Sequence, residues 1–397
     1  MSQSQPGSTT VDPHDVLALD GLLSDQELLI RSTVRDWVAN EIQPQVATWF
    51  ADGHLPRSLA REMGSLGLLG MHLHGYGCAG TSAVEYGLAA LELEAGDTGV
   101  RSFMSVQGSL AMFPIWAYGS DEQMDAGLPG MATGVFVGCF GLTEPDSGSD
   151  AANMTTTARR VGGGDWVING TKMWITNGDI ADVAIVWARA HDDTVRGFVV
   201  PTDTLGFSAN PIPRKMSLRA SNTAELVLDD VRLPADSVLP GVASMRGPLS
   251  CLSEARFGIL WGVMGAARTC YEASLSYAAD REAFGGPIAR YQLTQQRLVD
   301  MMVRVQRGTL LALHLGRLKD AGTLTPAQVS FGKMDNTREA LTVAREARAI
   351  HGANGITLDY PPIRHMLNLE TVATYEGTHE IHQLILGQAI TGHSAFA

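Results

Sequence analysis

The spacing of apolar and polar residues divides the chain into a helical part, a strand-like part and a second helical part. In the first part, apolar residues recur at helical spacing after Ser24, and Glu27 completes a capping box. Further helical patterns cover residues 57–69, 82–96 and 103–117. These textures predict a disordered tail and three domains, with bounds 1–15, 16–135, 136–245 and 246–397.

The last part of the chain has the clearest helical signals. Apolar residues follow a 3.6-residue period over residues 293–318, which predicts a long helix that ends near Gly322. Thr325, Pro326 and Gln328 then supply an N-cap, a first-turn proline and a capping-box partner for the next helix.

The middle part has the texture of short strands separated by turns. Asn169-Gly170 stands between two strand-like runs, 166–168 and 171–176, and predicts a hairpin because Asn-Gly readily adopts a type I′ turn. Further strands are expected at 184–188, 196–200 and 224–228. Since no helix-length pattern intervenes, we expect a compact antiparallel domain rather than a parallel βαβ sheet.

Composition excludes several classes of protein. Of 397 residues, 45% are hydrophobic and 18% charged, as in a globular protein. The net charge of −13 and the absence of a basic run argue against nucleic acid as a partner. No apolar run reaches the roughly 18 residues of a membrane span. Four separated cysteines and a start without an export signal favour buried thiols and a cytoplasmic location.

Three short patterns resemble functional motifs, but we interpret none of them as a functional site. The histidines and cysteine at 72–78 and the pair His379 and His382 lack the ligand number of a zinc site, so no metal is expected. The glycines at 75–80 satisfy G-x-G-x-x-G but lie among helices, which indicates an inter-helix turn. Ser330-Phe331-Gly332-Lys333 matches S-x-x-K in mid-helix without its partner motifs, and we attribute it to chance.

Three segments are candidates for chemistry. Residues 139–150 combine hydroxyls and glycines in a turn whose N–H groups suit a flavin edge or phosphate, although a plain Asx/Ser turn is the alternative. Trp174 beside Thr176 offers an aromatic wall and a hydroxyl, or an ordinary core tryptophan. Glu376 lies beside a helix-breaking Gly377, where it projects into a cavity or is a solvated surface glutamate.

Together these segments resemble the acyl-CoA dehydrogenase family. The family's motifs occur in its order over nearly the whole chain: L-T-E-P-x-S-G-S-D at 142–150, W-I-T-N at 174–177, Asp280-Arg281 with Phe284-Gly285, Gly-Ala-Asn-Gly at 352–355, and Tyr375-Glu376-Gly377-Thr378. The resemblance implies FAD as cofactor. It also implies an N-terminal helical domain, a middle antiparallel β-barrel domain and a C-terminal four-helix bundle.

Within the family, the chain most resembles the members that act on glutaryl-CoA. The resemblance implies that Glu376 is the general base that removes the α-proton while the β-carbon gives hydride to flavin N5. Arg101 then binds the γ-carboxylate, with Ser102 beside it and Glu94 as its acidic neighbour, a surface charge being the alternative for Glu94. Loss of CO2 to form crotonyl-CoA is the expected second half-reaction.

The resemblance also assigns the remaining contacts. It places at the substrate Ser149, Leu252, Arg256, Tyr375 and Gly377. It places at the cofactor Phe140, Leu142, Thr143, Gly148, Ser149, Trp174, Ile175, Thr176, Arg281, Phe284, Gln292, Gly352, Ala353, Thr378 and Glu380. Arg281 and Gln292 match residues that reach the flavin of a neighbouring subunit, which implies a homotetramer.

Other functions remain open from the sequence. A different short acyl-CoA, or glutaryl-CoA oxidised without decarboxylation, is the nearest alternative. A non-catalytic acyl-CoA-binding scaffold is a remote one, which predicts a colourless protein. The expected electron acceptor is electron-transferring flavoprotein, the usual partner in the family.

Overall fold

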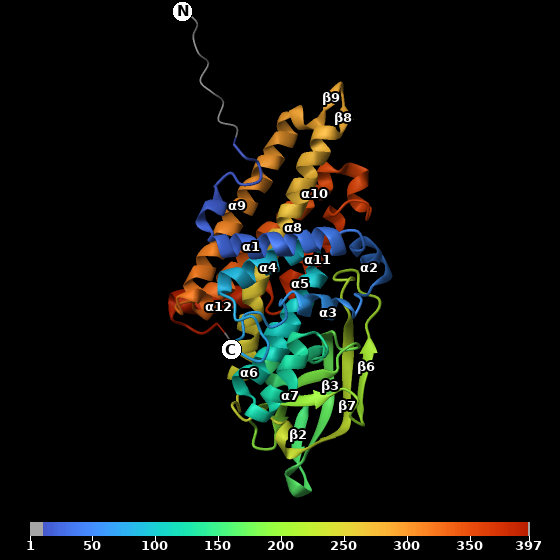
Figure 1. Cartoon of the computed structure of the whole chain (residues 1–397), viewed down its shortest axis with the longest axis vertical. Helices are drawn as coiled ribbons and strands as arrows, with labels where there is room; N and C mark the ends of the chain where they lie inside the picture. Colours follow the sequence, from blue (N-terminus) through green and yellow to red (C-terminus); the bar gives the residue numbers. More distant parts are fainter. Residues whose placement is uncertain (1–10, 396–397) are drawn as a thin grey trace, which may run out of the picture.

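The computed structural model describes residues 11–395. Long helices occupy one end of the elongated molecule and the sheet occupies the other (Figure 1). Residues 1–10 of the predicted disordered tail lie outside the described residues. Within residues 11–15, Pro13 O accepts a hydrogen bond from Tyr271 Oη and His14 O accepts one from Gln306 Nε2, both at 3.0 Å. The extent of the disordered tail stays a prediction.

The N-terminal part is helical, as its apolar pattern predicts. Ser24 and Glu27 form the predicted capping box of α1, and Ser82 with Glu85 forms another at α4. Nearly all of α4 is buried because α1, α5, α8 and α9 pack around it. The helices are α1 (Asp25–Trp37), α2 (Val46–Asp52), α3 (Leu59–Ser65), α4 (Ala83–Gly96), α5 (Thr98–Ser105), α6 (Phe113–Tyr118) and α7 (Asp121–Ala132), with a π-helical segment (Val106–Met112) between α5 and α6.

A mixed sheet follows, with hydrogen-bonded order β1-β4-β2-β3-β7-β6 and β5 on β4. Its strands are β1 (Gly138–Gly141), β2 (Thr157–Arg160), β3 (Trp166–Thr176), β4 (Val183–Ala190), β5 (Val195–Pro201), β6 (Phe207–Pro211) and β7 (Thr223–Leu233). The antiparallel expectation is wrong for β4, which pairs in parallel with β1 and β2. The chain segments that make these crossovers contain no α-helix. Closure into a barrel stays a prediction.

The predicted hairpin at Asn169-Gly170 is wrong, because both residues lie inside the continuous strand β3. The register with β7 shifts between Ile168 and Gly170, so the pair forms an irregularity in the ladder rather than a turn. Gly170 has φ 153°, and a Cβ there would lie 2.4 Å from Thr156 Oγ1. Asn169 exchanges hydrogen bonds with Asp230 on β7. Asn-Gly therefore marks a close backbone approach here.

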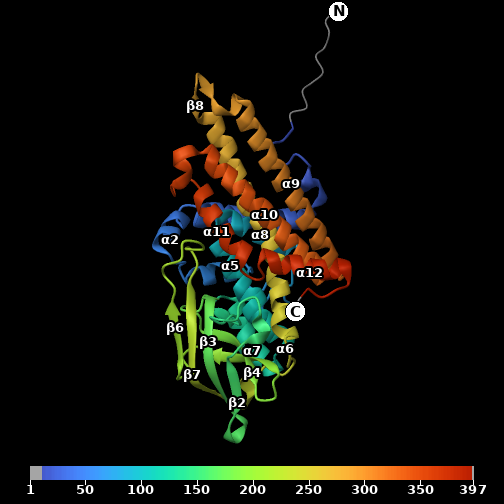
Figure 2. The ribbon, with the colours of Figure 1, turned by 180° about the vertical axis from the view of Figure 1, so that it is seen from behind.

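The C-terminal part consists of helices, of which the first runs from the sheet end to the tip of the molecule (Figure 2). They are α8 (Arg246–Asp280), α9 (Gln292–Asp320), α10 (Pro326–Ile350), α11 (Pro362–Thr374) and α12 (His379–Thr391), with a small ribbon of β8 (Glu282–Ala283) and β9 (Gly286–Pro287). The predicted long helix is α9, and Thr325 caps α10 with Gln328 as predicted. Helices α8, α9 and α10 pack on one another. A four-helix bundle and the exact domain bounds stay predictions.

Candidate active site

Glu376 lies in the short link between α11 and α12. Tyr375 ends α11 in an extended conformation, and Thr378 starts α12 by accepting a hydrogen bond from Ile381 N. Between them Glu376 adopts φ 52° and Gly377 φ 97°, so two consecutive residues are left-handed. A Cβ on Gly377 would lie 2.9 Å from His382 Nε2, which leaves room only for glycine. The unusual backbone turns the Glu376 side chain out of the helical path.

The surroundings of the Glu376 carboxyl group favour its protonated form. Its Oε2 is buried without a hydrogen-bond partner among the described residues. Burial raises the pKa of Glu376, although the charges of Arg101, Arg256 and Lys333 act in the opposite direction. The alternative of a solvated surface glutamate is wrong. A buried carboxylate with a raised pKa is suited to act as a general base.

Two cationic side chains hold the backbone carbonyl groups of this link. Arg256 Nε donates to Glu376 O at 2.7 Å. Lys333 Nζ donates to Tyr375 O at 3.0 Å and to Gly377 O at 2.7 Å. Lys333 belongs to the S-x-x-K match that we attributed to chance, yet its position on the buried face of α10, four residues after buried Val329, is a signal that could have found it.

Arg101 on α5 contacts Tyr375, the residue before Glu376. Its Nε donates to Glu94 Oε2 at 2.6 Å and its Nη2 to Tyr375 Oη at 2.5 Å, while Ser102 Oγ lies 3.2 Å from that oxygen. Both Glu94 and Arg101 are fully buried, so the surface-charge alternative for Glu94 is wrong. Burial opposes the charge of Arg101, but Glu94 and Tyr375 raise its pKa and keep it cationic. Arg101 Nη1 has no hydrogen-bond partner within residues 11–395.

The turn that follows β1 is anchored by a buried ion pair. Lys172 Nζ on β3 donates to Leu142 O at 3.0 Å and to Glu144 Oε1 at 2.9 Å. Glu144 also accepts hydrogen bonds from Thr155 and Thr156. Burial opposes ionisation of Glu144, but these hydrogen bonds lower its pKa to about 2. These hydrogen bonds hold the turn that follows β1 rigidly, and we call this turn the platform.

The residues predicted to contact the cofactor's ring lie around this platform. Trp174 is 60% exposed and has φ 64°, so the core-tryptophan alternative is wrong. Met173 N donates to Thr143 O at 2.8 Å, which joins β3 to the turn. Phe140, Leu142 and Ile175 are buried beneath, whereas Gly148 and Ser149 are exposed. An exposed indole and an exposed glycine-rich turn fit the wall and edge contacts of a flat cofactor.

One loop, residues 212–222, connects the platform with the Glu376 link. Asn177 N, just after Thr176, donates to Asn222 O at 2.9 Å. Four residues earlier in the loop, Leu218 N donates to Asn368 Oδ1 on α11 at 2.8 Å. Since α11 ends at Tyr375, hydrogen bonds run from β3 to the helix that leads into Glu376. Leu252 is half-buried on α8, and Glu380 is exposed in the first turn of α12.

A second group of predicted cofactor residues lies apart from the first. Arg281, Phe284 and Gln292 surround the β8–β9 ribbon at the tip of the molecule (Figure 1). Gly352 and Ala353 lie at the same end of the molecule, since the next residue, Asn354, donates a hydrogen bond to Tyr277 near the end of α8. About 37 Å along the helix axis separates Arg256, which contacts the Glu376 link, from Arg281, the residue that follows α8. The second group therefore lies far from the Glu376 link of the same chain.

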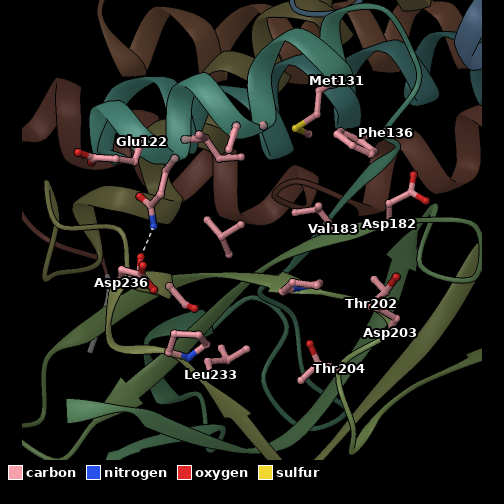
Figure 3. Close-up of a pocket in the computed structure, with 18 of the residues that line it drawn as sticks. Glu122, Met131, Phe136, Asp182, Val183, Thr202, Asp203, Thr204, Leu233 and Asp236 are labelled. Atoms are coloured by element: carbon pink, nitrogen blue, oxygen red, sulfur yellow. Dashed lines mark hydrogen bonds between the residues drawn. The ribbon is translucent and has the colours of Figure 1, made fainter. Parts of the chain in front are cut away.

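A pocket of about 940 Å³ lies between α7 and the sheet (Figure 3). Met131, Phe136, Val183 and Leu233 line its apolar part, and none of the predicted site residues lines it. We assign it no role in the chemistry. Within residues 11–395, no three His, Cys, Asp or Glu side chains are grouped to hold a metal ion. The same residues contain no helix with the length and apolarity needed to cross a membrane.

Known proteins share sequence and fold with this chain. Family models described as acyl-CoA dehydrogenase N-terminal, middle and C-terminal domain match residues 24–135, 139–231 and 245–391. The mitochondrial short-chain specific acyl-CoA dehydrogenase of Homo sapiens is 33% identical over 378 residues, which cover 94% of this chain and 90% of that protein.

Two solved structures of glutaryl-CoA dehydrogenase from Mycobacterium smegmatis are also similar. The one in complex with FADH2 is 57% identical with a TM-score of 0.96, covering 98% of this chain and 100% of that chain. The other is 62% identical with a TM-score of 0.95, covering 97% and 99%. The family models in chain order confirm the three-part organisation of helices, sheet and helices. The chain belongs to the acyl-CoA dehydrogenase family.

Proposed function

We propose that this acyl-CoA dehydrogenase uses FAD to convert glutaryl-CoA to crotonyl-CoA and CO2. The observation that carries the proposal is the pairing of two groups in one cluster, Glu376 with its buried Oε2 and the fully buried Arg101. Glu376 presents a carboxylate oxygen without a partner among residues 11–395, and Arg101, joined to it through Tyr375, presents a nitrogen without one. The first suits the removal of an α-proton and the second suits a distal carboxylate.

The chain's residues divide the first half-reaction between them. Glu376 takes the proton from the carbon next to the thioester, and its burial makes the carboxylate a stronger base. The Glu376 N–H has no acceptor within residues 11–395 and is available to the thioester oxygen as negative charge develops there. FAD, when bound, would supply the acceptor for the hydride of the β-carbon, and loss of the α-proton and this hydride would give glutaconyl-CoA.

The platform beside β3 fits the isoalloxazine ring of FAD. Exposed Trp174 supplies a wall for the ring, and Thr176 a hydroxyl at its edge. The backbone of the turn at residues 142–143, fixed by the Lys172–Glu144 pair, suits the remaining polar edge. The turn is also exposed at residues 148–149, where a ligand can approach it closely.

Arg101 is the basis for choosing glutaryl-CoA over an unsubstituted acyl chain. Arg101 has almost no exposed surface, and its Nη1 is unpaired among the described residues, so this nitrogen can donate to a carboxylate of the substrate. The γ-carboxylate of a glutaryl group supplies it. In the second half-reaction the bond between the γ-carbon and this carboxylate breaks, CO2 leaves, and the electron pair forms a dienolate. Glu376, now protonated, returns its proton to the γ-carbon and crotonyl-CoA results.

The separation of the two groups of cofactor residues supports a multimer. Another subunit must bring the tip end of α8 to the platform of the first if the second group is to reach FAD; this group is Arg281, Phe284, Gln292, Gly352 and Ala353. A homotetramer, as in the family resemblance, meets this need. We further propose electron-transferring flavoprotein as the electron acceptor and a cytoplasmic location.

A second candidate function is the oxidation of another short acyl-CoA. It is favoured by the 33% identity to a short-chain specific acyl-CoA dehydrogenase. Glutaryl-CoA labelled in its free carboxyl group distinguishes the possibilities. Labelled CO2 together with crotonyl-CoA supports the proposal, whereas glutaconyl-CoA as the final product rejects decarboxylation. A purified yellow protein that is bleached by butyryl-CoA but not by glutaryl-CoA supports the second candidate.

A further inference from the structure

Lys333 is the one lysine of the described chain whose Nζ donates to the backbone on both sides of Glu376. Its side chain is fully buried on α10, and no carboxylate forms an ion pair with it within residues 11–395. Burying an unpaired ammonium group is costly, and a methionine would fill the same space without that cost. Unlike a methionine, the ammonium group donates hydrogen bonds to the Tyr375 and Gly377 carbonyls.

Because the peptide before Glu376 is trans, the hydrogen bonds from Lys333 also set the direction of the Glu376 N–H group. In the peptide unit between Tyr375 and Glu376, which is not cis, the carbonyl group and the N–H group point in opposite directions. Lys333 draws the Tyr375 carbonyl toward α10. The Glu376 N–H therefore points away from α10, and it has no acceptor within residues 11–395.

The same contacts fix the conformation of the link. Glu376 at φ 52° is unfavourable for a residue with a Cβ, and such a conformation persists only where the surroundings hold it. Lys333 holds the carbonyls before and after Glu376, while Arg256 holds the carbonyl of Glu376 itself. Three consecutive carbonyl groups are thus bound by cations on α8 and α10.

We propose that Lys333 is a positioning residue, which orients the Glu376 N–H toward the thioester oxygen of an acyl-CoA and holds the carboxylate at the α-carbon. This role rests on the proposed function, because it gives the N–H an acceptor in the substrate. Lys333 acts through the backbone and does not touch the reacting atoms. Its ammonium group also adds to the positive field at Glu376 that Arg101 and Arg256 produce.

The test compares Lys333→Met with a matched control on the same helix, Asn336→Leu. Asn336 is also fully buried, and its Nδ2 donates to the Leu260 and Gly308 carbonyls, so it binds α8 and α9 rather than the Glu376 link. Both variants lose a buried donor that is bonded to two carbonyls, so we expect similar falls in melting temperature and retention of FAD in each. Only Lys333→Met should lower kcat, by about 10- to 100-fold, with KM within about threefold of wild type.

Two further measurements separate positioning from simple stabilisation. Infrared spectra of bound acyl-CoA with a ¹³C-labelled thioester carbonyl should show a stretching frequency lowered by wild type and by Asn336→Leu but not by Lys333→Met. The acid limb of the kcat/KM profile should move to higher pH in Lys333→Met, because one of the positive charges that lower the pKa of Glu376 is removed. The charged or titratable groups that remain around Glu376 are Arg101 on α5, Arg256 on α8, Tyr375 at the end of α11, and His379 and His382 on α12.

Lys333→Gln keeps a donor for a carbonyl without the charge and should restore part of kcat. Wild-type kcat and an unchanged carbonyl frequency in Lys333→Met would overturn the proposal, as would failure of both Lys333 variants to fold, which would indicate a purely structural role. If wild type itself is not bleached by any short acyl-CoA, the proposed function fails. If wild type is bleached and Lys333→Met behaves identically, only the role of Lys333 fails.

Discussion

Two glutamates, Glu144 and Glu376, have the same side chain and opposite surroundings. Glu144, in the turn of the platform, accepts hydrogen bonds at both oxygens, and its pKa falls to about 2. Glu376 has a buried oxygen without a partner among the described residues, and its pKa is raised. The number of donors around a carboxylate thus decides whether it anchors a fold or remains free to take a proton.

The two buried lysines beside these glutamates also differ in what they bind. Lys172 binds the Glu144 carboxylate and one carbonyl, and burial lowers its pKa to about 8. Lys333 binds two carbonyls and leaves the Glu376 carboxylate alone, and burial lowers its pKa to about 7. At the platform a cation neutralises the carboxylate, whereas at the Glu376 link cations hold the backbone around it.

Replacing the free carboxylate should have the largest effect. Glu376→Gln is nearly isosteric but cannot accept a proton, so we expect substrate-induced bleaching of FAD to slow by about 10⁴-fold, with FAD still bound. Stopped-flow absorbance with glutaryl-CoA measures it. Glu370→Gln, an exposed residue of α11 paired with Arg345, is the control and should bleach at the wild-type rate. Rapid bleaching of Glu376→Gln would show that another group is the base.

Replacing the bonded carboxylate should instead weaken the fold. Glu144→Gln leaves the buried Lys172 ammonium without a charge partner, and we expect a loss of about 3 kcal/mol in stability and weaker retention of FAD. Denaturant unfolding and flavin release measure the two effects. Glu92→Gln removes a comparable buried partner, that of Arg35 and Arg268, and should lower stability without weakening FAD retention. Equal flavin loss in both variants would contradict the role of Glu144 at the platform.

Much of the fold follows from local signals in the sequence. The capping boxes of α1 and α10 and the period of α9 depend on residues a few positions apart, so the chain pattern is enough to predict them. The hairpin at Asn169-Gly170 failed because its local preference was overridden by pairing with β7 and by the approach of Thr156. The parallel pairing of β4 was missed for a similar reason, since no local pattern shows which strands meet.

The candidate site also contains some residues that the sequence could predict and others that it could not. Glu376, Arg101 and Trp174 lie in motifs, and the family resemblance located them. Lys333 is 43 positions before Glu376 and acts on main-chain atoms, so no side-chain motif connects the two; the match to S-x-x-K pointed to unrelated chemistry. Arg256 was expected at CoA, and its hydrogen bond to the Glu376 carbonyl required the packing of α8 against the α11–α12 link.

The pair of Arg101 and Glu94 sharpens the comparison, because here a buried ion pair is expected to serve the substrate. Arg101→Gln should reduce kcat/KM for glutaryl-CoA about 100-fold more than for butyryl-CoA, the value of one charge-assisted contact of about 2.7 kcal/mol. Comparing two substrates in one variant cancels any loss of folded protein. Arg268→Gln, which also strips a buried glutamate of an arginine, should leave the substrate ratio unchanged. An equal loss on both substrates in Arg101→Gln would remove it from specificity.

The smallest effect, about tenfold per pH unit, should separate the two glutamates along the pH axis. Glu376 has a pKa above the ordinary 4.5, so the rate of bleaching should fall as the pH drops through that raised value and the base becomes protonated. Glu144 has a folded pKa of about 2, below its unfolded value, so its contribution to stability is complete above 4.5 and is lost between 4.5 and 2. Acidification should therefore stop the chemistry before the platform loosens, leaving a window in which the protein is folded, yellow and inactive. Parallel titrations of bleaching rate and FAD retention measure the window. If both fall together, the two carboxylates do not differ in the way their surroundings indicate.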